Sequence, residues 1–351
     1  MSTRKKPTAI DLFSGCGGLT EGLRQAGFRV IGAIEVDPLA AATYRANHRR
    51  VHVWERDICS VKISELKRSL GLRRGQLDLM AGCPPCQGFS SMRSLNGKLS
   101  VEDERNDLIY QFLRFVRGLL PKTIMMENVP GLREDRRYGH FLRQLRALGY
   151  EHIDEDVRNA QFFGVPQRRR RLILMASRIA PVSAPQADSR LRTVREFIGT
   201  LPEAGKSGDP VHDLPEKRSK KIRQLITRIP KDGGSRSDLP ASAQLDCHKK
   251  CDGFYDVYGR MAWDSVSPTI TGGCFNPSKG RFLHPSSNRA ITIREAALLQ
   301  TFPLRYKFPD VSRKQDLALL IGNALPPEMI RRFALAMRNG FTGRRDRCHA
   351  E

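Results

Sequence analysis

The fold of this chain is decided near its beginning, by the stretch Asp11-Leu-Phe-Ser-Gly15-Cys-Gly17-Gly18-Leu-Thr-Glu-Gly22. A predicted strand, Thr8–Phe13, runs into this loop, and a predicted helix, Leu19–Ala26, leaves it. Glycines at such a junction let the backbone approach a ligand closely, and they leave the first amides of the helix free to bind a polar group. The stretch therefore predicts a strand, loop and helix that bind a ligand at the end of the strand.

Strand-like and helix-like segments alternate through the first half of the chain. The further predicted strands are Val30–Val36, Val51–Ile58, Leu77–Ala81 and Thr123–Val129. The further predicted helices are Pro38–Asn47, Ile63–Leu70 and Asp107–Leu119. This alternation predicts parallel βαβ units, and hence an α/β fold with a doubly wound, mostly parallel sheet. Ligands of such sheets bind at the carboxyl ends of the strands.

The region from about residue 177 to residue 288 has a different character, with many Pro, Gly, Ser and charged residues and weak periodicity. It predicts a second, smaller and irregular domain. A final predicted helix, Pro326–Met337, begins with prolines, which are good helix starters. We expect a large domain over residues 1–176, a second domain with its supporting motif over 177–303, and a segment over 304–351 that returns to the large domain.

The chain is strongly basic, with 60 Lys and Arg against 37 Asp and Glu, a net charge of +23. Because Lys and Arg release counterions when they bind phosphates, this excess favours a nucleic acid partner over solubility alone. At 40% apolar residues, the composition is that of a globular protein. There is neither an uncharged apolar run of about 18 residues nor the apolar stretch of a secretory signal, so we expect no membrane span and no export.

Two acids follow the next predicted strands. Glu35 lies about 20 residues after the glycine loop, where a carboxylate can bind ribose hydroxyls. Asp57 ends the third predicted strand and can accept a hydrogen bond from an adenine amino group. With the loop, these acids indicate a cofactor that contains a nucleoside. The loop departs from the G-x-G-x-x-G pattern of NAD enzymes. Either acid, taken alone, could equally well be a solvated side chain at the end of a strand.

A loop with two cysteines follows the fourth predicted strand, Ala81-Gly82-Cys83-Pro84-Pro85-Cys86-Gln87-Gly88-Phe89-Ser90. Its prolines stiffen the backbone and fix where the Cys86 thiol points, and a thiol becomes a nucleophile where nearby cations or helix amides lower its pKa. The C-x-x-C spacing also occurs in zinc half-sites and in redox pairs. The nearest second pair, Cys247 and Cys251, lies in the other predicted domain, and a thioredoxin-like fold has no glycine loop before its pair. We therefore expect no metal, and the eight cysteines fit a reducing cytosol.

Two further polar motifs follow the fifth predicted strand. Met126-Glu127-Asn128-Val129 carries either a surface acid or a carboxyl that holds the amino group and ring nitrogen of a cytosine. The second motif is either a solvated basic run or a strand, and it reads Gly164-Val-Pro-Gln167-Arg168-Arg169-Arg170-Arg171. Alternate side chains of a strand share a face, so Arg169 and Arg171 would point together, with one face toward a base and the other toward a phosphate.

Taken in order across residues 11 to 327, these motifs resemble those of the DNA (cytosine-5) methyltransferases of bacterial restriction-modification systems. The matching segments are the glycine loop, Glu35, Asp57, Pro84-Pro85-Cys86-Gln87, Glu127-Asn128-Val129 and Gln167-Arg168-Arg169-Arg170-Arg171. Two more are Arg289-Ala-Ile-Thr-Ile-Arg-Glu295-Ala-Ala-Leu-Leu-Gln300-Thr-Phe-Pro303 and Gly322-Asn323-Ala-Leu-Pro-Pro327. A slight departure is Leu325, where Val is more usual. The resemblance covers the chain almost from end to end.

The resemblance implies a class I, Rossmann-like fold, the cofactor S-adenosylmethionine, and double-stranded DNA as substrate. Cys86 would add to C6 of a cytosine flipped out of the duplex. Glu127 would bind the N3 and N4 edge of the base, Arg169 would lie near O2, and Arg171 would support Arg169.

The resemblance also implies which residues line the two ligands. The cofactor residues are Phe13, Gly15, Gly17, Glu35, Asp57, Ile58, Pro84, Leu108 and Asn323. The DNA-binding residues are Gln87, Ser90, Gln167, Thr269 and Ile270. The second domain would be the target recognition domain, organised from behind by the motif at 289–303.

We expect a monomeric enzyme of the bacterial cytoplasm, associated with the nucleoid, which acts beside a cognate restriction endonuclease without a stable complex. Two alternatives stay open. The first is an RNA cytosine-5 methyltransferase of the same fold, although a recognition region of over a hundred residues favours DNA. The second is a non-catalytic DNA-binding protein descended from this fold, which would have lost the nucleophile, the acid or the glycine loop, whereas all three are present.

Overall fold

The computed structural model describes residues 6–85, 107–240, 242, 244, 256–309 and 313–342. The chain divides into two compact units. Unit 1 comprises residues 1–159, 170–187 and 327–351, and unit 2 comprises residues 160–169 and 188–326.

These boundaries differ from the predicted ones at three places, the first of which is that residues 177–187 belong to unit 1. Residues 160–169 belong to unit 2, because the segment around Gln167 pairs with Ser267: Arg168 N donates to Ser267 O at 2.9 Å, and Ser267 N donates to Pro166 O at 2.8 Å. Residues 304–326 also belong to unit 2, and only the last helix returns to unit 1. Composition does not reveal a pairing between segments about 100 residues apart.

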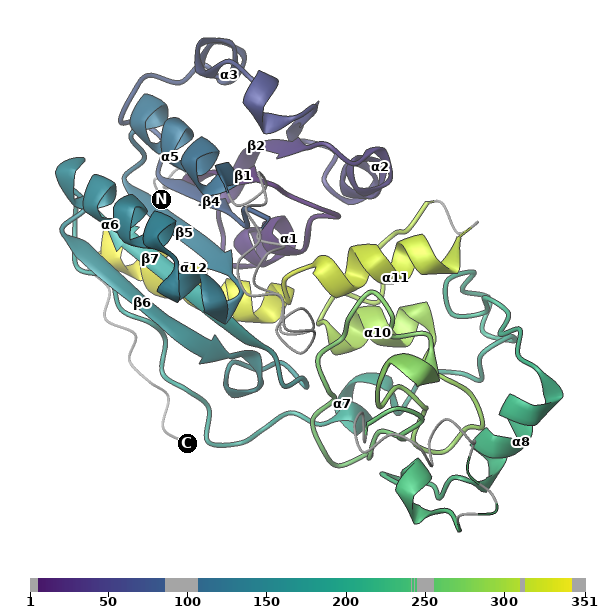
Figure 1. Cartoon of the computed structure of the whole chain (residues 1–351). Helices are drawn as coiled ribbons and strands as arrows, with labels where there is room; N and C mark the ends of the chain where they lie inside the picture. The colour runs from purple at the N-terminus through teal and green to yellow at the C-terminus, as the bar shows by residue number, and fades with distance from the viewer. Residues whose placement is uncertain are drawn as a thin grey trace, which may run out of the picture. The chain divides into compact units, whose positions relative to one another are not determined.

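Unit 1 contains a seven-stranded sheet, within the part of the chain that is described, in the order β3-β2-β1-β4-β5-β7-β6 (Figure 1). The strands are β1 (Thr8–Leu12), β2 (Arg29–Glu35), β3 (His52–Glu55), β4 (Leu79–Gly82), β5 (Thr123–Asn128), β6 (His152–Asn159) and β7 (Arg170–Ser177). Strands β1 to β5 pair in parallel, and β7 is antiparallel to both β5 and β6. The predicted doubly wound, mostly parallel sheet is confirmed.

Helices cover both faces of this sheet. They are α1 (Gly18–Gln25), α2 (Pro38–Asn47), α3 (Ile63–Leu70), α5 (Leu108–Leu119), α6 (Arg136–Ala147) and α12 (Pro327–Thr342). The largest apolar cluster joins α3, α5 and α6 to the strands, with Leu66, Phe112 and Phe141 at its centre. This packing fixes the strands, and hence the loops at their ends.

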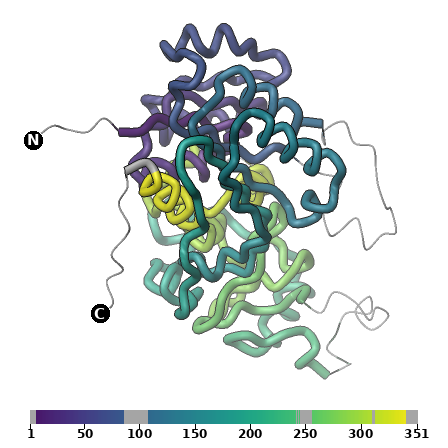
Figure 2. The backbone as a smooth tube through the Cα atoms, turned by 90° about the vertical axis from the view of Figure 1, so that its left-hand side faces the viewer, coloured from purple at the N-terminus to yellow at the C-terminus, as the bar shows by residue number. Residues whose placement is uncertain are grey.

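The last helix packs along α1, and Figures 1 and 2 both show the yellow α12 beside the purple start of the chain. A Cβ atom at Gly22 would lie 2.5 Å from the Pro327 carbonyl oxygen and 2.6 Å from Ile330 Cβ. The glycine after the loop is therefore needed for close packing of two helices. The last helix therefore belongs to unit 1, and its neighbour is α1 rather than the first strand, which we had expected.

Unit 2 is irregular, as predicted. Its α-helices are α7 (Val194–Ile198), α8 (Lys220–Arg228), α10 (Ile293–Leu299) and α11 (Lys314–Asn323). Because buried carbonyl groups require a hydrogen-bond donor, side chains of this unit donate to many of its buried backbone carbonyl oxygens. Fully buried Arg260, for example, donates to the carbonyl oxygens of Ile226 at 2.7 Å and of Ser287 at 2.6 Å.

No helix within the described ranges is long and apolar enough to cross a membrane. The same ranges contain no group of three or more His, Cys, Asp or Glu side chains placed to hold a metal ion.

Candidate active site

The candidate site of unit 1 lies where the sheet reverses its winding. Strand β1 pairs with β2 on one side and with β4 on the other, so the loops after β1 and β4 leave the same edge in opposite directions. Ligands of doubly wound sheets bind at such a switch point. The strands approach closely here, because a Cβ atom at Gly82 would lie 2.5 Å from the Leu12 carbonyl oxygen.

Glu35 joins the end of β2 to the glycine loop. Its Oε2 accepts a hydrogen bond from Gly15 N at 2.7 Å, and its Oε1 accepts from Val36 N at 2.9 Å and from Asp37 N at 2.8 Å. Burial raises the pKa of Glu35, and the three amide donors oppose that shift. Since a carboxylate offers about four acceptor positions, Glu35 keeps capacity for the hydroxyl groups of a ribose.

The loop itself has the backbone that a close ligand requires. Phe13, Gly15 and Gly17 have positive φ angles of 60°, 53° and 96°. The left-handed conformation costs a residue with a side chain about 1–2 kcal/mol, and such strain gathers at functional sites. A Cβ atom at Gly15 would meet no other atom within 4 Å, so the space beside this backbone is open. The loop, the acid Glu35 and half-buried Phe13 therefore fit a nucleoside cofactor.

Asp57 lies in a turn rather than at the end of a strand. Strand β3 ends at Glu55, and Asp57 caps the 3-10 turn Ile58–Ser60 by accepting from Cys59 N at 2.7 Å. The prediction that Asp57 ends the third strand was wrong, because this turn begins immediately after it. The Asp57 side chain is exposed and Ile58 is buried.

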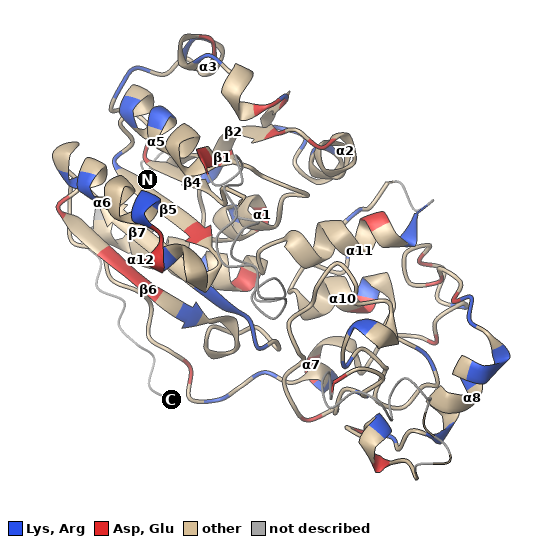
Figure 3. Cartoon of the chain, viewed as in Figure 1, with Lys and Arg blue, Asp and Glu red and all other residues tan. Residues whose placement is uncertain are grey.

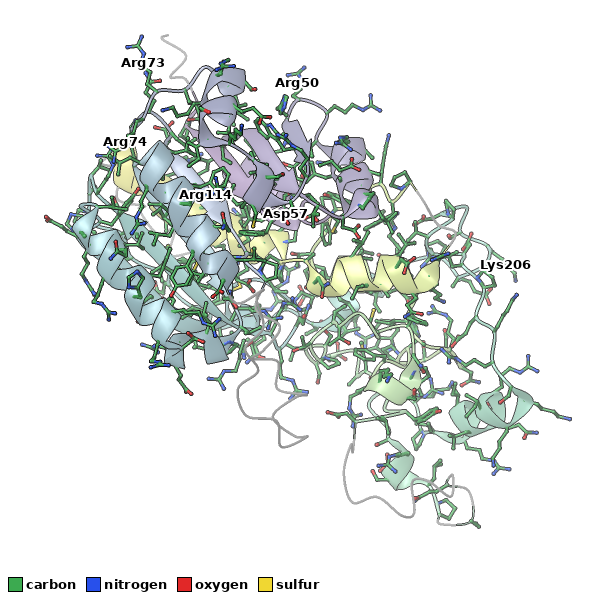
Figure 4. All side chains as sticks on the ribbon, turned by 45° about the horizontal axis from the view of Figure 1, so that its top comes forward. Arg50, Asp57, Arg73, Arg74, Arg114 and Lys206 are labelled. Atoms are coloured by element: carbon green, nitrogen blue, oxygen red, sulfur yellow. The ribbon has the colours of Figure 1, made fainter. Side chains whose placement is uncertain are left out.

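Arg114 of α5 supports that turn, and the sequence analysis did not identify it. Its Nη2 donates to the Ile58 carbonyl oxygen at 2.6 Å, and its Nη1 donates to that of Val61 at 3.1 Å. Figure 4 labels Arg114, which comes from α5, and Asp57. The available signal was weak: an arginine between the buried residues Leu113 and Phe115.

A buried acid beneath the glycine loop was also missed. Asp11 of β1 is fully buried, and its Oδ2 accepts from Thr20 Oγ1 of α1 at 2.7 Å. Thr20 Oγ1 lies 2.7 Å from the hydroxyl of Tyr44 in α2. Burial raises the pKa of Asp11 to about 7, against the opposing hydrogen bond from Thr20. This chain of polar groups ties two helices to the strand that carries the loop.

Glu127 and Arg171 form the second cluster of unit 1. Arg171 Nε lies 2.8 Å from Glu127 Oε1, and both side chains are largely buried. The antiparallel pairing of β5 with β7 makes this contact possible, because it sets Glu127 opposite Ile173 and Asn128 opposite Leu172. Arg171 therefore holds the acid itself, whereas we had expected it to support Arg169.

Asn128 connects this cluster to the cysteine loop. Its Nδ2 donates to the Pro84 carbonyl oxygen at 2.9 Å, and its Oδ1 accepts from Val129 N at 2.8 Å. The end of β5 is thus bonded to the chain that leaves β4. Pro84 is buried, whereas Cys86, Gln87 and Ser90 lie outside the described residues.

Arg169 belongs to unit 2, and the interpretation that it shares a strand face with Arg171 was wrong. Strand β7 begins at Arg170, so Arg169 falls just outside it. Its guanidinium group donates to the carbonyl oxygens of Ile270 at 3.1 Å, Gly322 at 3.0 Å and Ala324 at 3.1 Å. Arg169 therefore joins three segments of unit 2.

Gln167 needs a similar correction, because the structure does not support its predicted contact with DNA. It is fully buried: its Nε2 donates to Gln300 Oε1 at 3.0 Å, and its Oε1 accepts from Ile270 N at 3.0 Å. Ile270 is also fully buried, so its side chain does not fit a direct contact with DNA either. Half-buried Thr269 donates from Oγ1 to the Arg168 carbonyl oxygen at 2.5 Å. Gln167 thus clamps the segment 269–270 in place.

Two further predicted cofactor residues belong to helices rather than to the loops described so far. Half-buried Leu108 is the first residue of α5 and packs against the core of unit 1. Exposed Asn323 ends α11 in unit 2. The structure thus brings Phe13, Gly15, Gly17, Glu35 and Pro84 to one edge of unit 1, and it places Asn323 in the other unit.

Residues 8–339 match the sequence pattern of the C-5 cytosine-specific DNA methylases. The chain belongs to this family. It is 37% identical over 355 residues to the Type II methylase M.HgiDII of Herpetosiphon aurantiacus, and the alignment covers 96% of this chain and 97% of that protein. It is 32% identical over 337 residues to the Type II methyltransferase M1.HphI of Haemophilus parahaemolyticus, covering 94% and 86% of the two chains.

Solved structures show the same fold at lower identity. The methyltransferase EhMeth of Entamoeba histolytica superposes with a TM-score of 0.65 at 16% identity, covering 96% of this chain and 99% of that one. The Dnmt2 methyltransferase of S. pombe superposes with a TM-score of 0.61 at 20% identity, covering 97% and 100%.

This methylase transfers a methyl group from S-adenosylmethionine to carbon 5 of cytosine in DNA. The alternative of an RNA methyltransferase is not favoured, because the family and the named Type II relatives are DNA methylases. The fold, the cofactor and the enzyme class implied by the motifs are confirmed.

We predict that Arg114→Ala weakens S-adenosylmethionine binding several-fold, because the turn after Asp57 loses two hydrogen bonds to its carbonyl oxygens. Titration calorimetry of the purified enzyme measures this. Arg117→Ala on the same helix is the matched control, since exposed Arg117 contacts Gln144 instead. Equal affinities of the two variants would contradict the supporting role of Arg114.

We predict that Arg171→Ala lowers kcat at least tenfold, because Glu127 loses the cation that orients its carboxylate. Steady-state methylation at saturating duplex DNA measures this, and thermal unfolding shows whether the variant is folded. Arg170→Ala, the exposed neighbour on β7, is expected to keep most of the activity. A folded Arg171→Ala enzyme with the wild-type kcat would show that the ion pair is dispensable.

Proposed function

We propose that this methylase modifies cytosine within one short DNA sequence and serves as the modification enzyme of a bacterial restriction-modification system. Support comes from the Type II methylases of Herpetosiphon aurantiacus and Haemophilus parahaemolyticus, which match this chain over almost its whole length. We further propose that it acts as a monomer in the cytoplasm, associated with the nucleoid and without a stable complex with an endonuclease.

Cys86 is the proposed nucleophile. Carbon 5 of cytosine is too weak a nucleophile to attack a methylsulfonium directly, so the Cys86 thiolate adds to C6 and moves electron density to C5. S-adenosylmethionine would supply the methyl group to C5 and leave as S-adenosylhomocysteine. Loss of the C5 proton then returns the electron pair to the ring, and elimination of Cys86 releases 5-methylcytosine. The base is flipped out of the duplex for this reaction.

Glu127 is the group that holds the base in this proposal. Its carboxyl binds the N3 and N4 edge of the cytosine and stabilises the charge that develops at N3 after addition to C6. The observation that carries the proposal is the pair of contacts at the end of β5. Arg171 holds Glu127 at 2.8 Å, and the next residue, Asn128, bonds Pro84 at 2.9 Å, two residues before Cys86 in the chain.

The proposed cofactor residues include the five at the edge of unit 1 and several from other segments. Phe13 packs against the nucleoside, Glu35 binds the ribose, and Asp57 binds the adenine amino group. The other proposed cofactor residues are Gly15, Gly17, Ile58, Pro84, Leu108 and Asn323.

Unit 2 is the proposed target recognition domain. Arg169 and Gln167 hold the segment 269–270 within it, and Arg169 keeps its proposed place near O2 of the base. Gln87, Ser90 and Thr269 are the proposed contacts to DNA. The motif around Glu295 supports this unit, because buried Glu295 accepts two hydrogen bonds of 2.7 Å from Arg289.

We predict that Cys86→Ser abolishes methyl transfer to duplex DNA, because a hydroxyl is far less readily ionised than a thiol, while binding of DNA and of S-adenosylmethionine survives. Transfer of labelled methyl groups measures the first, and gel-shift and calorimetric titrations measure the second. Cys83→Ser, in the same loop, is the matched control and is expected to stay active. Substantial turnover by Cys86→Ser would refute the nucleophile assignment.

We predict that plasmid DNA from cells expressing the enzyme resists restriction endonucleases that cut the methylated sequence. Digestion beside plasmid from cells with Cys86→Ser measures this protection. Equal cutting of the two plasmids at methylated sites would contradict a protective role.

A further inference from the structure

Helix α8 of unit 2 presents two different sides. Leu225 and Ile226 are buried and pack with Ile229, Leu239, Tyr258 and Leu283. Arg260 also donates to the Ile226 carbonyl oxygen at 2.7 Å. The apolar side of α8 is therefore fixed in the core of unit 2, and its other side faces the solvent.

The solvent side of α8 is basic and has no acid of its own. Exposed cations on or just before the helix are Lys217, Lys220, Lys221, Arg223 and Arg228. None of the five has a carboxylate partner among the residues that the structure describes, and the nearby Glu216 is held by Arg218. Figure 3 shows blue segments and no red segment on α8.

This arrangement works against the stability of the helix. The amino end of a helix carries partial positive charge and favours acids, yet the first turn of α8 has no acid and begins with Lys220 and Lys221. Lys220 and Arg223 are also spaced three residues apart, where like charges repel. Helix α6 also begins with two cations, Arg136 and Arg137, but its cap is an acid: Asp135 Oδ1 accepts from Arg137 N at 2.6 Å and lies 3.2 Å from Arg137 Nε. An anion that binds at α8 would offset this repulsion.

We propose that the outer face of α8 binds the phosphate backbone of the duplex DNA that this enzyme methylates, independently of the base sequence. The proposal rests on the DNA methylase activity and adds a docking surface to it. Long side chains that end in cations suit phosphates, which position a protein on DNA without reading it. Each phosphate neutralised in this way makes binding more sensitive to salt.

The chemistry of the face favours DNA over a membrane surface and over a partner protein. A helix that binds a membrane surface buries its apolar side in lipid, but that side of α8 is already buried in unit 2. A protein interface needs apolar or aromatic anchors, and no large apolar side chain of α8 is among the exposed ones. Duplex DNA requires only the cations.

The test is a triple variant, Lys220→Gln, Lys221→Gln and Arg223→Gln, in the full-length enzyme. The affinity for a duplex that contains the target is measured across a range of salt concentrations. We expect the slope of log K against log salt to become shallower by about 0.9 per lost phosphate contact. At saturating DNA, kcat is expected to stay at the wild-type value, because α8 carries no residue of the proposed reaction.

The matched control is Arg136→Gln, Arg143→Gln and Arg146→Gln, which removes three exposed charges from α6 in unit 1. Both triple variants carry a net charge of 23 − 3 = +20. The control is expected to keep the wild-type slope. Thermal unfolding of the α8 variant is expected at or above the wild-type temperature, because repulsion at the start of the helix is removed.

Three results would overturn the proposal or its basis. An unchanged slope in a folded α8 variant would exclude α8 as a phosphate contact. An equal change in both variants would show that net charge alone acts. A wild-type enzyme that does not methylate duplex DNA would overturn the activity itself, whereas the first two results leave that activity intact.

Discussion

The parallel pairing of β1 with both β2 and β4 is the constraint on which the rest of this enzyme depends. It brings the ends of three strands to one edge of the sheet, and Gly82 lets two of them approach closely. From that edge, the glycine loop reaches Glu35 and the loop after β4 meets Asn128. The proposed cofactor residues at this edge thus come from separate parts of the sequence, but a single sheet geometry positions them.

The two units stabilise their polar groups in different ways. In unit 1, the backbone hydrogen bonds are made between regular strands. The Arg171 side chain pairs with Glu127, and the backbone of the glycine loop donates to Glu35. In unit 2, little regular structure is present among the described residues, and arginines donate to carbonyl oxygens instead. Arg169 and Arg260 are the main examples, each joining segments that are distant in sequence. An irregular unit can vary its surface loops while such buried arginines hold its core, which suits the role in target recognition that we propose for unit 2.

Much of unit 1 could be predicted because its signals are local. The bounds of α2 and α3 match the prediction, and α2 begins with the cap Asp37 and with Pro38. The errors arose where distant segments meet. No local feature of the sequence shows that the chain belongs to unit 2 up to Arg169 and returns to unit 1 at Arg170. Arg169 and Arg171 were therefore assigned to one strand face. Gln167 looked like a surface residue because its partners, Gln300 and Ile270, lie more than 100 residues away. Arg114 and Asp11 were missed because each sits in an apolar run, and only the folded packing shows what they support.

We propose that this enzyme methylates cytosine in one specific DNA sequence through Cys86. The decisive measurement is bisulfite sequencing of genomic DNA from cells expressing the enzyme, beside cells expressing the Cys86→Ser variant. We expect 5-methylcytosine at a single position of one short recurring sequence, present with the wild type and absent with the variant. Methylation that persists in the variant, or DNA without 5-methylcytosine in the presence of folded wild-type enzyme, would contradict it.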